Sequence, residues 1–92
     1  MAKVTVSLPL PWRSDGSLPK TVEVDADDLA TALERVASRS PHVRRAMYRV
    51  DGQLRESIGV FVNDRDARGG DGLRHRLRDG DGIVVVAASA GG

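Results

Sequence analysis

The feature that most constrains the fold is one amphipathic segment, residues 25–40, set between short stretches of alternating apolar and polar residues. Its apolar residues recur at the spacing of a single helix face: Leu29, Leu33, Val36 and Ala37. Asp25 is suited to cap the helix, with Asp27 and Asp28 in the first turn, where negative charge complements the helix dipole. A helix with one apolar stripe needs another layer to pack against.

Alternating stretches on both sides of this helix predict the strands of that layer. Residues 3–8 and 21–24 alternate with period two and are suited to pair as an antiparallel ribbon, joined by a long irregular connection around Trp12. Residues 58–62 predict a third strand. Four consecutive apolar residues, 83–86, indicate a last strand at the centre of the sheet.

Two shorter helical segments are expected between the strands. Pro41 disfavours a helical conformation at Ser40, so the main helix should end there, and the same pair is suited to start a short helix that runs to Met47. Leu73 and Leu77 are spaced as one helical turn would place them.

The order of these elements predicts an α+β fold of the ubiquitin-like β-grasp type. In this arrangement a mixed sheet of four to five strands packs on one main helix, and the last strand returns to the sheet centre. We expect one β-grasp domain over residues 1–87, followed by a flexible reactive tail over residues 88–92.

Composition excludes several classes of function. The net charge is +1, with 14 basic and 13 acidic residues, so no strong attraction to nucleic acid or to a membrane surface is expected. There are no cysteines, and no apolar run approaches the length of a membrane span. The first residues do not have the shape of a signal peptide, and these features together favour the cytoplasm.

No internal group of residues predicts an enzyme or a metal site. His42 and His75 lack the spacing of a metal-ligand pair and are interpreted as surface residues. The aspartates near the main helix, together with Asp79 and Asp81, are explained by helix capping and turn formation. The basic residues over 74–78 are interpreted as a solvated rim, with docking to an acidic partner as the second reading.

The sequence ends on Gly91-Gly92, after the small-residue run over residues 87–90. Glycine has no Cβ, so such a backbone fits through a narrow channel. Residues 88–92 extend over roughly 17 Å at most. This pattern predicts a carboxylate that is delivered into the active site of another protein; the alternatives are a frayed tail and a remnant of a cloning vector.

The second half of the chain carries a series of short motifs: Phe61 to Arg68, Gly72-Leu73 with Leu77, Asp79 to Asp81, Ile83 to Val86, and Ala90-Gly91-Gly92. With its motifs in this order, the chain resembles the ubiquitin-like sulfur-carrier proteins of thiamine, molybdopterin and cysteine biosynthesis. It is most similar to the cysteine-type carriers of actinobacteria. The connection over residues 9–19 is longer than in the thiamine and molybdopterin types, which disfavours a strict assignment to either pathway.

The resemblance implies a reaction cycle centred on Gly92. An E1-like enzyme would adenylate the Gly92 carboxylate with ATP, and a sulfur donor would convert the adenylate to a thiocarboxylate. A biosynthetic enzyme, of the cysteine synthase or the thiosugar or thiazole synthase type, would then take the sulfur. Ser89, Ala90 and Gly91 would be recognised by the partner. The chain would be a protein co-substrate, a monomer when free, with no cofactor of its own.

The resemblance also implies a docking face. Phe61, Val84 and Val86 are expected on the sheet face away from the helix, where family members contact activating enzymes. Alternatively, these are ordinary strand residues. Two other functions stay open at this point: a ubiquitin-like modifier conjugated through Gly92 to lysines, and a plain β-grasp binding module.

Overall fold

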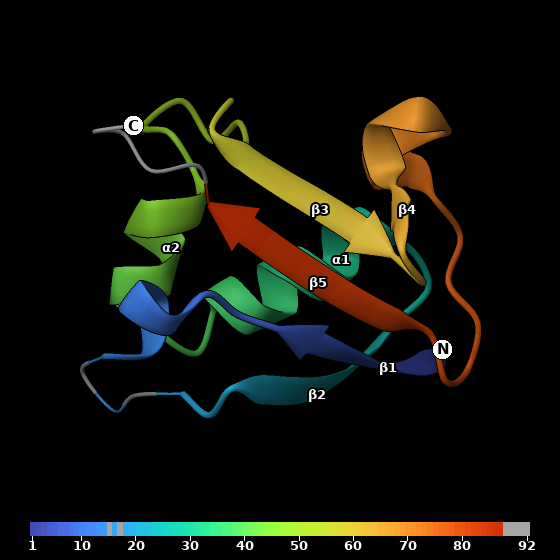
Figure 1. The fold of residues 1–92 in the computed structure, drawn as a ribbon, viewed down its shortest axis with the longest axis horizontal. Coiled ribbons are helices and arrows are strands. Elements are labelled where there is room, and N and C mark those ends of the chain that lie inside the picture. The colour runs from blue at the N-terminus through green and yellow to red at the C-terminus, as the bar shows by residue number, and fades with distance from the viewer. Residues whose placement is uncertain (15, 17, 88–92) are drawn as a thin grey trace.

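Five strands form one mixed sheet in the order β2-β1-β5-β3-β4, in a computed structural model that describes residues 1–14, 16 and 18–87 (Figure 1). The strands are β1 (Ala2–Ser7), β2 (Thr21–Ala26), β3 (Ile58–Val62), β4 (Arg65–Asp66) and β5 (Gly82–Ala87). The helices are α1 (Leu29–Ala37) and α2 (Pro41–Met47), with short 3-10 helices η1 (Leu10–Arg13), η2 (Ala67–Gly69) and η3 (Gly72–Arg74).

The last strand lies at the centre of the sheet, as its apolar run predicts. β5 pairs parallel with β1 and antiparallel with β3, while β1 with β2 and β3 with β4 are antiparallel pairs. Val85 of β5 lies opposite Val60, and Ile83 lies beside Val6. This is the predicted β-grasp arrangement, with one addition: the two-residue strand β4 has no alternation of its own and was not predicted.

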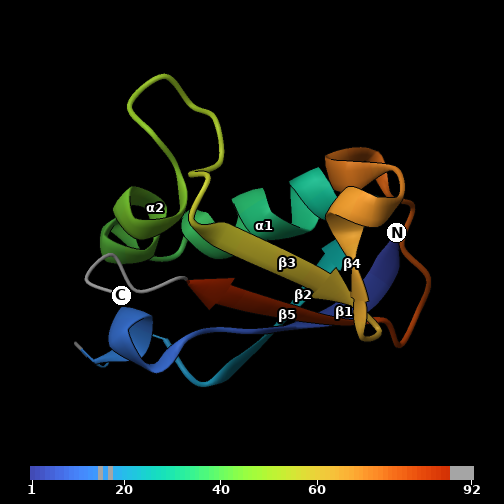
Figure 2. The same ribbon diagram turned by 45° about the horizontal axis from the view of Figure 1, so that its top comes forward.

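The core lies between α1 and one face of the sheet. All four apolar residues of the predicted helix stripe are buried, as are the inward-facing side chains of the four longer strands. Figure 2 shows α1 and α2 on one side of the sheet, while the other side carries no helix over its centre. In the part of the chain that the structure describes, no helix is long and apolar enough to span a bilayer.

The start of α1 differs from the prediction. Asp25 lies in β2 opposite Lys3, and the N-cap is Asp28, whose Oδ1 accepts a hydrogen bond from the Thr31 N–H at 2.8 Å. The apolar residues Val24 and Ala26 pack in the core, which extends β2 beyond the four residues that alternation indicates. The second helix begins at Pro41 as predicted, because the Ser40 hydroxyl accepts a hydrogen bond from the Val43 N–H at 3.2 Å.

Two other segments also differ from the prediction. The connection between β1 and β2 contains η1, and its Trp12 is buried in the core with 5% of its surface exposed. Leu73 and Leu77 do not share a helical turn, because η3 ends at Arg74; Leu77 is buried, whereas Leu73 is 39% exposed.

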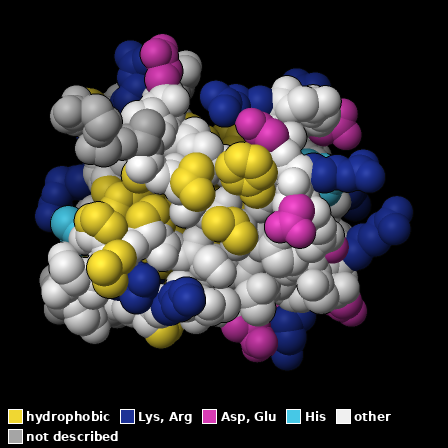
Figure 3. Space-filling model, viewed as in Figure 1, with side chains coloured by type: hydrophobic (Ala, Val, Ile, Leu, Met, Phe, Trp, Pro, Cys, Tyr) yellow, Lys and Arg dark blue, Asp and Glu magenta, His cyan; other side chains and the backbone are white. Residues whose placement is uncertain are grey.

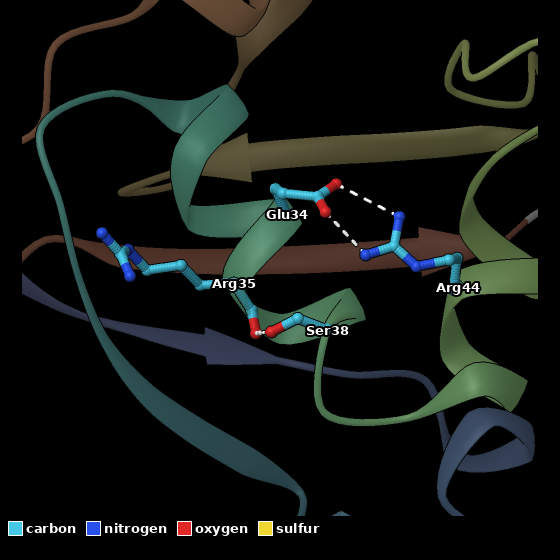
Figure 4. Close-up of polar contacts among 4 residues, drawn as sticks. All are labelled: Glu34, Arg35, Ser38 and Arg44. Carbon is cyan, nitrogen blue, oxygen red and sulfur yellow. Dashed lines mark hydrogen bonds and ion pairs between the residues drawn. The ribbon is translucent and has the colours of Figure 1, made fainter.

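An ion pair joins the two α-helices on the side away from the sheet. The Arg44 guanidinium donates to both carboxylate oxygens of Glu34, with its Nη2 2.6 Å from Oε1 and its Nη1 3.3 Å from Oε2 (Figure 4). On α1 itself, the Ser38 hydroxyl donates to the carbonyl of Arg35 at 2.7 Å. The ion pair between Glu34 and Arg44 orients α2 against the C-terminal half of α1.

Candidate functional site

The central strand β5 leads directly into the predicted reactive tail. Ala87, the last described residue, lies opposite Ile58 of β3. β1 pairs with the first half of β5, while β3 pairs with β5 through Ala87, so the point from which the following residues continue is held by β3. The predicted tail residues, Ser89, Ala90, Gly91 and Gly92, lie outside the described residues, and their roles stay predictions.

The three predicted docking residues lie on the open face of the sheet. Val84 and Val86 are 40% and 43% exposed, whereas their neighbour Val85 is 2% exposed. Phe61 is partly buried and lies opposite Val84 across the β3–β5 pair. The alternation on which the sequence argument rests is therefore confirmed, while the docking role of these residues stays a prediction.

Two further surface residues were not singled out from the sequence, and the first of them, Gly59, belongs to this face. Gly59 lies opposite Val86, and a Cβ at position 59 would come within 2.9 Å of Val86 Cγ2. A glycine inside a strand marks such close approaches, and this was the available signal. Leu10 of η1 is 67% exposed. Figure 3 shows hydrophobic side chains gathered on this face of the molecule, over the sheet and beside it.

A hydrogen-bonded turn fixes the opposite end of β5. Asn63 and Asp64 have φ of 49° and 71°, a left-handed conformation that these residue types tolerate better than most. The Asn63 side chain accepts from the Gly82 N–H at 2.9 Å and donates to Asp81 Oδ1 at 2.8 Å. Burial alone would raise the pKa of Asp81, but hydrogen bonds from the Arg78 N–H and from Asn63, with nearby positive charge, lower it overall.

Two other titratable residues, His42 and Asp79, make contacts within the fold. His42 Nε2 lies 3.3 Å from the Pro11 carbonyl oxygen, and Asp79 Oδ1 accepts from the Lys3 N–H at 2.8 Å. Over residues 1–14, 16 and 18–87, no group of three His, Cys, Asp or Glu side chains is placed to hold a metal ion. The described part of the chain thus offers an apolar face and a strand end that leads into the tail.

Known proteins similar to this chain share this architecture. The model of the ThiS family matches residues 16–92. A relative named sulfur carrier protein CysO, from Mycobacterium tuberculosis, is 29% identical over 91 residues, which cover 97% of this chain and 98% of the relative. A putative sulfur carrier protein from Archaeoglobus fulgidus is 34% identical over 74 residues, which cover 77% of this chain and 83% of that protein.

A solved structure of similar fold is the BexX/CysO complex of Amycolatopsis orientalis. The matched chain superposes with a TM-score of 0.82 at 32% identity, and the match covers 97% of this chain and 99% of that one. The likeness therefore extends over the sheet, both helices and the connections between them.

Proposed function

Because the chain belongs to the ThiS family, we propose that it is a sulfur carrier of the cysteine-biosynthesis type, a protein substrate of other enzymes and not itself a catalyst. The observation that carries this proposal is the family match, which extends through Gly92 and so includes the residues that would react. Two features of the structure support the proposal: β5 is paired with β3 up to the residue where the tail begins, and an open apolar face lies beside it.

The proposed chemistry begins at the Gly92 carboxylate. A carboxylate is a poor electrophile, so its oxygen first attacks the α-phosphate of ATP in an activating enzyme, and pyrophosphate leaves. The terminal sulfur of a persulfide then displaces AMP from the acyl-adenylate and forms a carbon–sulfur bond. A thiol next attacks the sulfur–sulfur bond that came with the persulfide, which leaves the thiocarboxylate and a disulfide. This soft nucleophile delivers its sulfur to a biosynthetic enzyme, such as a cysteine synthase or a thiosugar synthase.

The chain would contribute recognition rather than catalytic groups. We propose that residues 1–87 form the domain that docks, and that residues 88–92 form the tail that enters the partner's channel. Ser89, Ala90 and Gly91 are small enough for such a channel. An E1-like enzyme would contact Phe61, Val84 and Val86 on the open sheet face.

Mass spectrometry of the intact protein tests this function. After incubation with ATP, a cognate activating enzyme and a sulfur source, the protein should gain the mass difference between sulfur and oxygen, and lose it on sulfur transfer. Deletion of Gly92 should abolish the gain, while the exposed-loop variant Val50→Ser should retain it.

Two other outcomes would contradict the proposal. An unchanged mass with activating enzymes of demonstrated activity would argue against a carrier. Attachment to lysines of other proteins, with no thiocarboxylate formed, would instead indicate a modifier.

Removal of residues 88–92 should leave the unfolding midpoint unchanged, and a large decrease would contradict the division into domain and tail.

A further inference from the structure

An open hollow of about 460 Å³ lies at the end of the sheet where β5 begins. Basic side chains from two separate segments line it: Arg65 from β4, and His75, Arg76 and Arg78 from the connection before β5. A neighbouring hollow of about 470 Å³ shares Arg65 and His75 and continues past Asp66 to Gly70. Figure 3 shows Lys and Arg side chains gathered at the right edge of the molecule, on the side of β4 and this connection in Figure 1.

The arginines of this hollow are free to bind an external group. Among the residues that the structure describes, the guanidinium groups of Arg65, Arg76 and Arg78 make no hydrogen bond and no ion pair within 4.0 Å. Arg76 lies near enough to Asp28 to help lower the pKa of that carboxyl group, but forms no contact with it that would occupy its donors. Guanidinium groups recognise carboxylates and phosphates through paired hydrogen bonds.

The two carboxylates that line the hollows form no ion pair with these three arginines, although the positive charge of Arg78 helps to lower the pKa of Asp81. Asp66 is engaged by Arg68, whose Nη2 lies 3.1 Å from Oδ2 and whose backbone N–H donates to Oδ1 at 2.9 Å. Asp81 accepts from Asn63 and from the Arg78 N–H, each at 2.8 Å. Both carboxylates are thus held by residues of their own turns, which leaves three arginine side chains for a ligand of negative charge.

The position of the hollow indicates what kind of ligand fits. It lies at the start of β5, while the predicted tail follows the end of the same strand, and Gly82 to Ala87 span roughly 17 Å at about 3.3–3.4 Å per residue. The exposed side chains of Val84 and Val86 lie between these two points. Arg65 lies opposite the inward-facing Val62, so the hollow opens at the end of the sheet on the side of α1. A partner that receives the tail and extends along β5 past this end of the sheet therefore reaches the hollow as well.

We propose that this hollow docks an acidic segment, rich in Asp and Glu side chains, on the same partner protein that receives the C-terminus. The inference rests on the proposed function for the identity of that partner. Arginines spread over two segments and an open hollow match several carboxylates along a partner surface better than they match one enclosed anion. The contact would fix the orientation of the carrier on its partner protein and increase the rate of association at low salt.

Charge reversal with a matched control tests the docking. The double variant Arg65→Glu/Arg78→Glu should weaken binding to the activating enzyme by about tenfold and reduce the dependence of affinity on salt. Both side chains are exposed, so the fold should persist, which circular dichroism verifies. The control Arg35→Glu reverses one exposed arginine on α1, outside both hollows, and should bind as the wild type. The single variants Arg65→Glu and Arg78→Glu carry the same change of charge as this control and should each bind more weakly than it. Equal affinity of the double variant and this control would overturn the proposal.

A second measurement does not depend on the carrier function. A short capped polyglutamate peptide, titrated into the isotopically labelled protein, should shift the backbone amide resonances of Arg65, His75 and Arg78 in the wild type. It should not shift them in the double variant. Absent shifts, or shifts elsewhere on the surface, would overturn the acidic-segment assignment even if thiocarboxylate formation is observed.

Inorganic phosphate and ATP serve as competing probes in the same titration. If phosphate or ATP alone saturates the hollow at lower concentration than the peptide, the hollow is a site for a small anion, and the proposed protein contact is wrong. If the peptide binds the hollow but no thiocarboxylate forms with an active enzyme, the docking chemistry stands and the carrier function fails.

Discussion

At the scale of single residues, a few polar side chains determine where the elements begin. Asp28 starts α1, Ser40 starts α2, and Asn63 ties the β3–β4 turn to the first residue of β5. Each accepts a hydrogen bond from a backbone N–H that the adjoining regular structure leaves without a partner. These residues therefore set the register in which the apolar stripes meet.

Replacement of Asp28 should reveal its capping role. Asp28→Ala should lower the free energy of unfolding by about 1 kcal/mol at neutral pH, because the Thr31 N–H loses its acceptor. Asp28→Asn should lower the free energy of unfolding much less, because asparagine caps a helix almost as well as aspartate. Denaturant unfolding of both variants beside the wild type measures this, and equal losses for Ala and Asn would contradict the capping assignment.

The charge of Asp28 adds a dependence on pH. The hydrogen bonds from Thr31, together with the positive charge of Arg76, hold the pKa of Asp28 below its ordinary value of 3.8. Ionised Asp28 therefore stabilises the fold above that ordinary value, and this contribution disappears as the pH falls through the lowered pKa. The stability difference between the wild type and Asp28→Asn should shrink on acidification, whereas a constant difference down to acidic pH would contradict this assignment.

At the scale of elements, α1 and the sheet stabilise each other through one apolar layer. Leu33 has none of its surface exposed and lies at the centre of the helix stripe, between Leu29 and Val36. The core of so short a chain contains few large side chains. The loss of one should therefore take a large share of the total stability.

Leu33→Ala should lower the free energy of unfolding by roughly 2–5 kcal/mol, the usual result of emptying a leucine site in a core. The control Arg35→Ala changes an exposed residue on the same helix and should remain within about 0.5 kcal/mol of the wild type. An unchanged denaturation midpoint for Leu33→Ala would show that this helix face does not carry the core.

At the scale of the whole molecule, the two faces of the sheet differ in what covers them. One face is covered by α1 and α2, and the other presents Phe61, Val84 and Val86. A partner that receives the tail must press against the surface from which the tail continues. Desolvation of these side chains would supply part of its binding energy.

Substitutions on the open face should weaken binding to the activating enzyme and leave the fold intact. Phe61→Ala, Val84→Asp and Val86→Asp should each cost about 2 kcal/mol of binding free energy, as anchors near an interface centre commonly do. Val86→Asp should bind more weakly than Val86→Ala, because its carboxylate would be buried without a partner. Titration calorimetry measures these affinities, with Val50→Asp as an exposed control outside the sheet. Wild-type affinity for all three variants would exclude this face from the interface.

The sequence by itself determined the two α-helices, four of the strands, and which strand residues face the core and which face outward. These features depend on local periodicity, since side chains two apart in a strand, or three and four apart in a helix, share a face. The alternation around Val85 was therefore enough to place Val84 and Val86 on the open face. The family, too, was indicated by motifs along the chain and confirmed by the match over residues 16–92.

Only the tertiary structure decided which residue caps α1, where Trp12 lies and how β4 pairs. Asp25, Asp27 and Asp28 are all suitable caps, and the choice depended on how far β2 extends to bury Ala26 against the helix. Trp12 entered the core because α2 packs against η1, a contact between segments about thirty residues apart in sequence. The basic hollow combines Arg65 with Arg78 for the same reason: such contacts arise from packing between distant segments, and local periodicity carries no information about them.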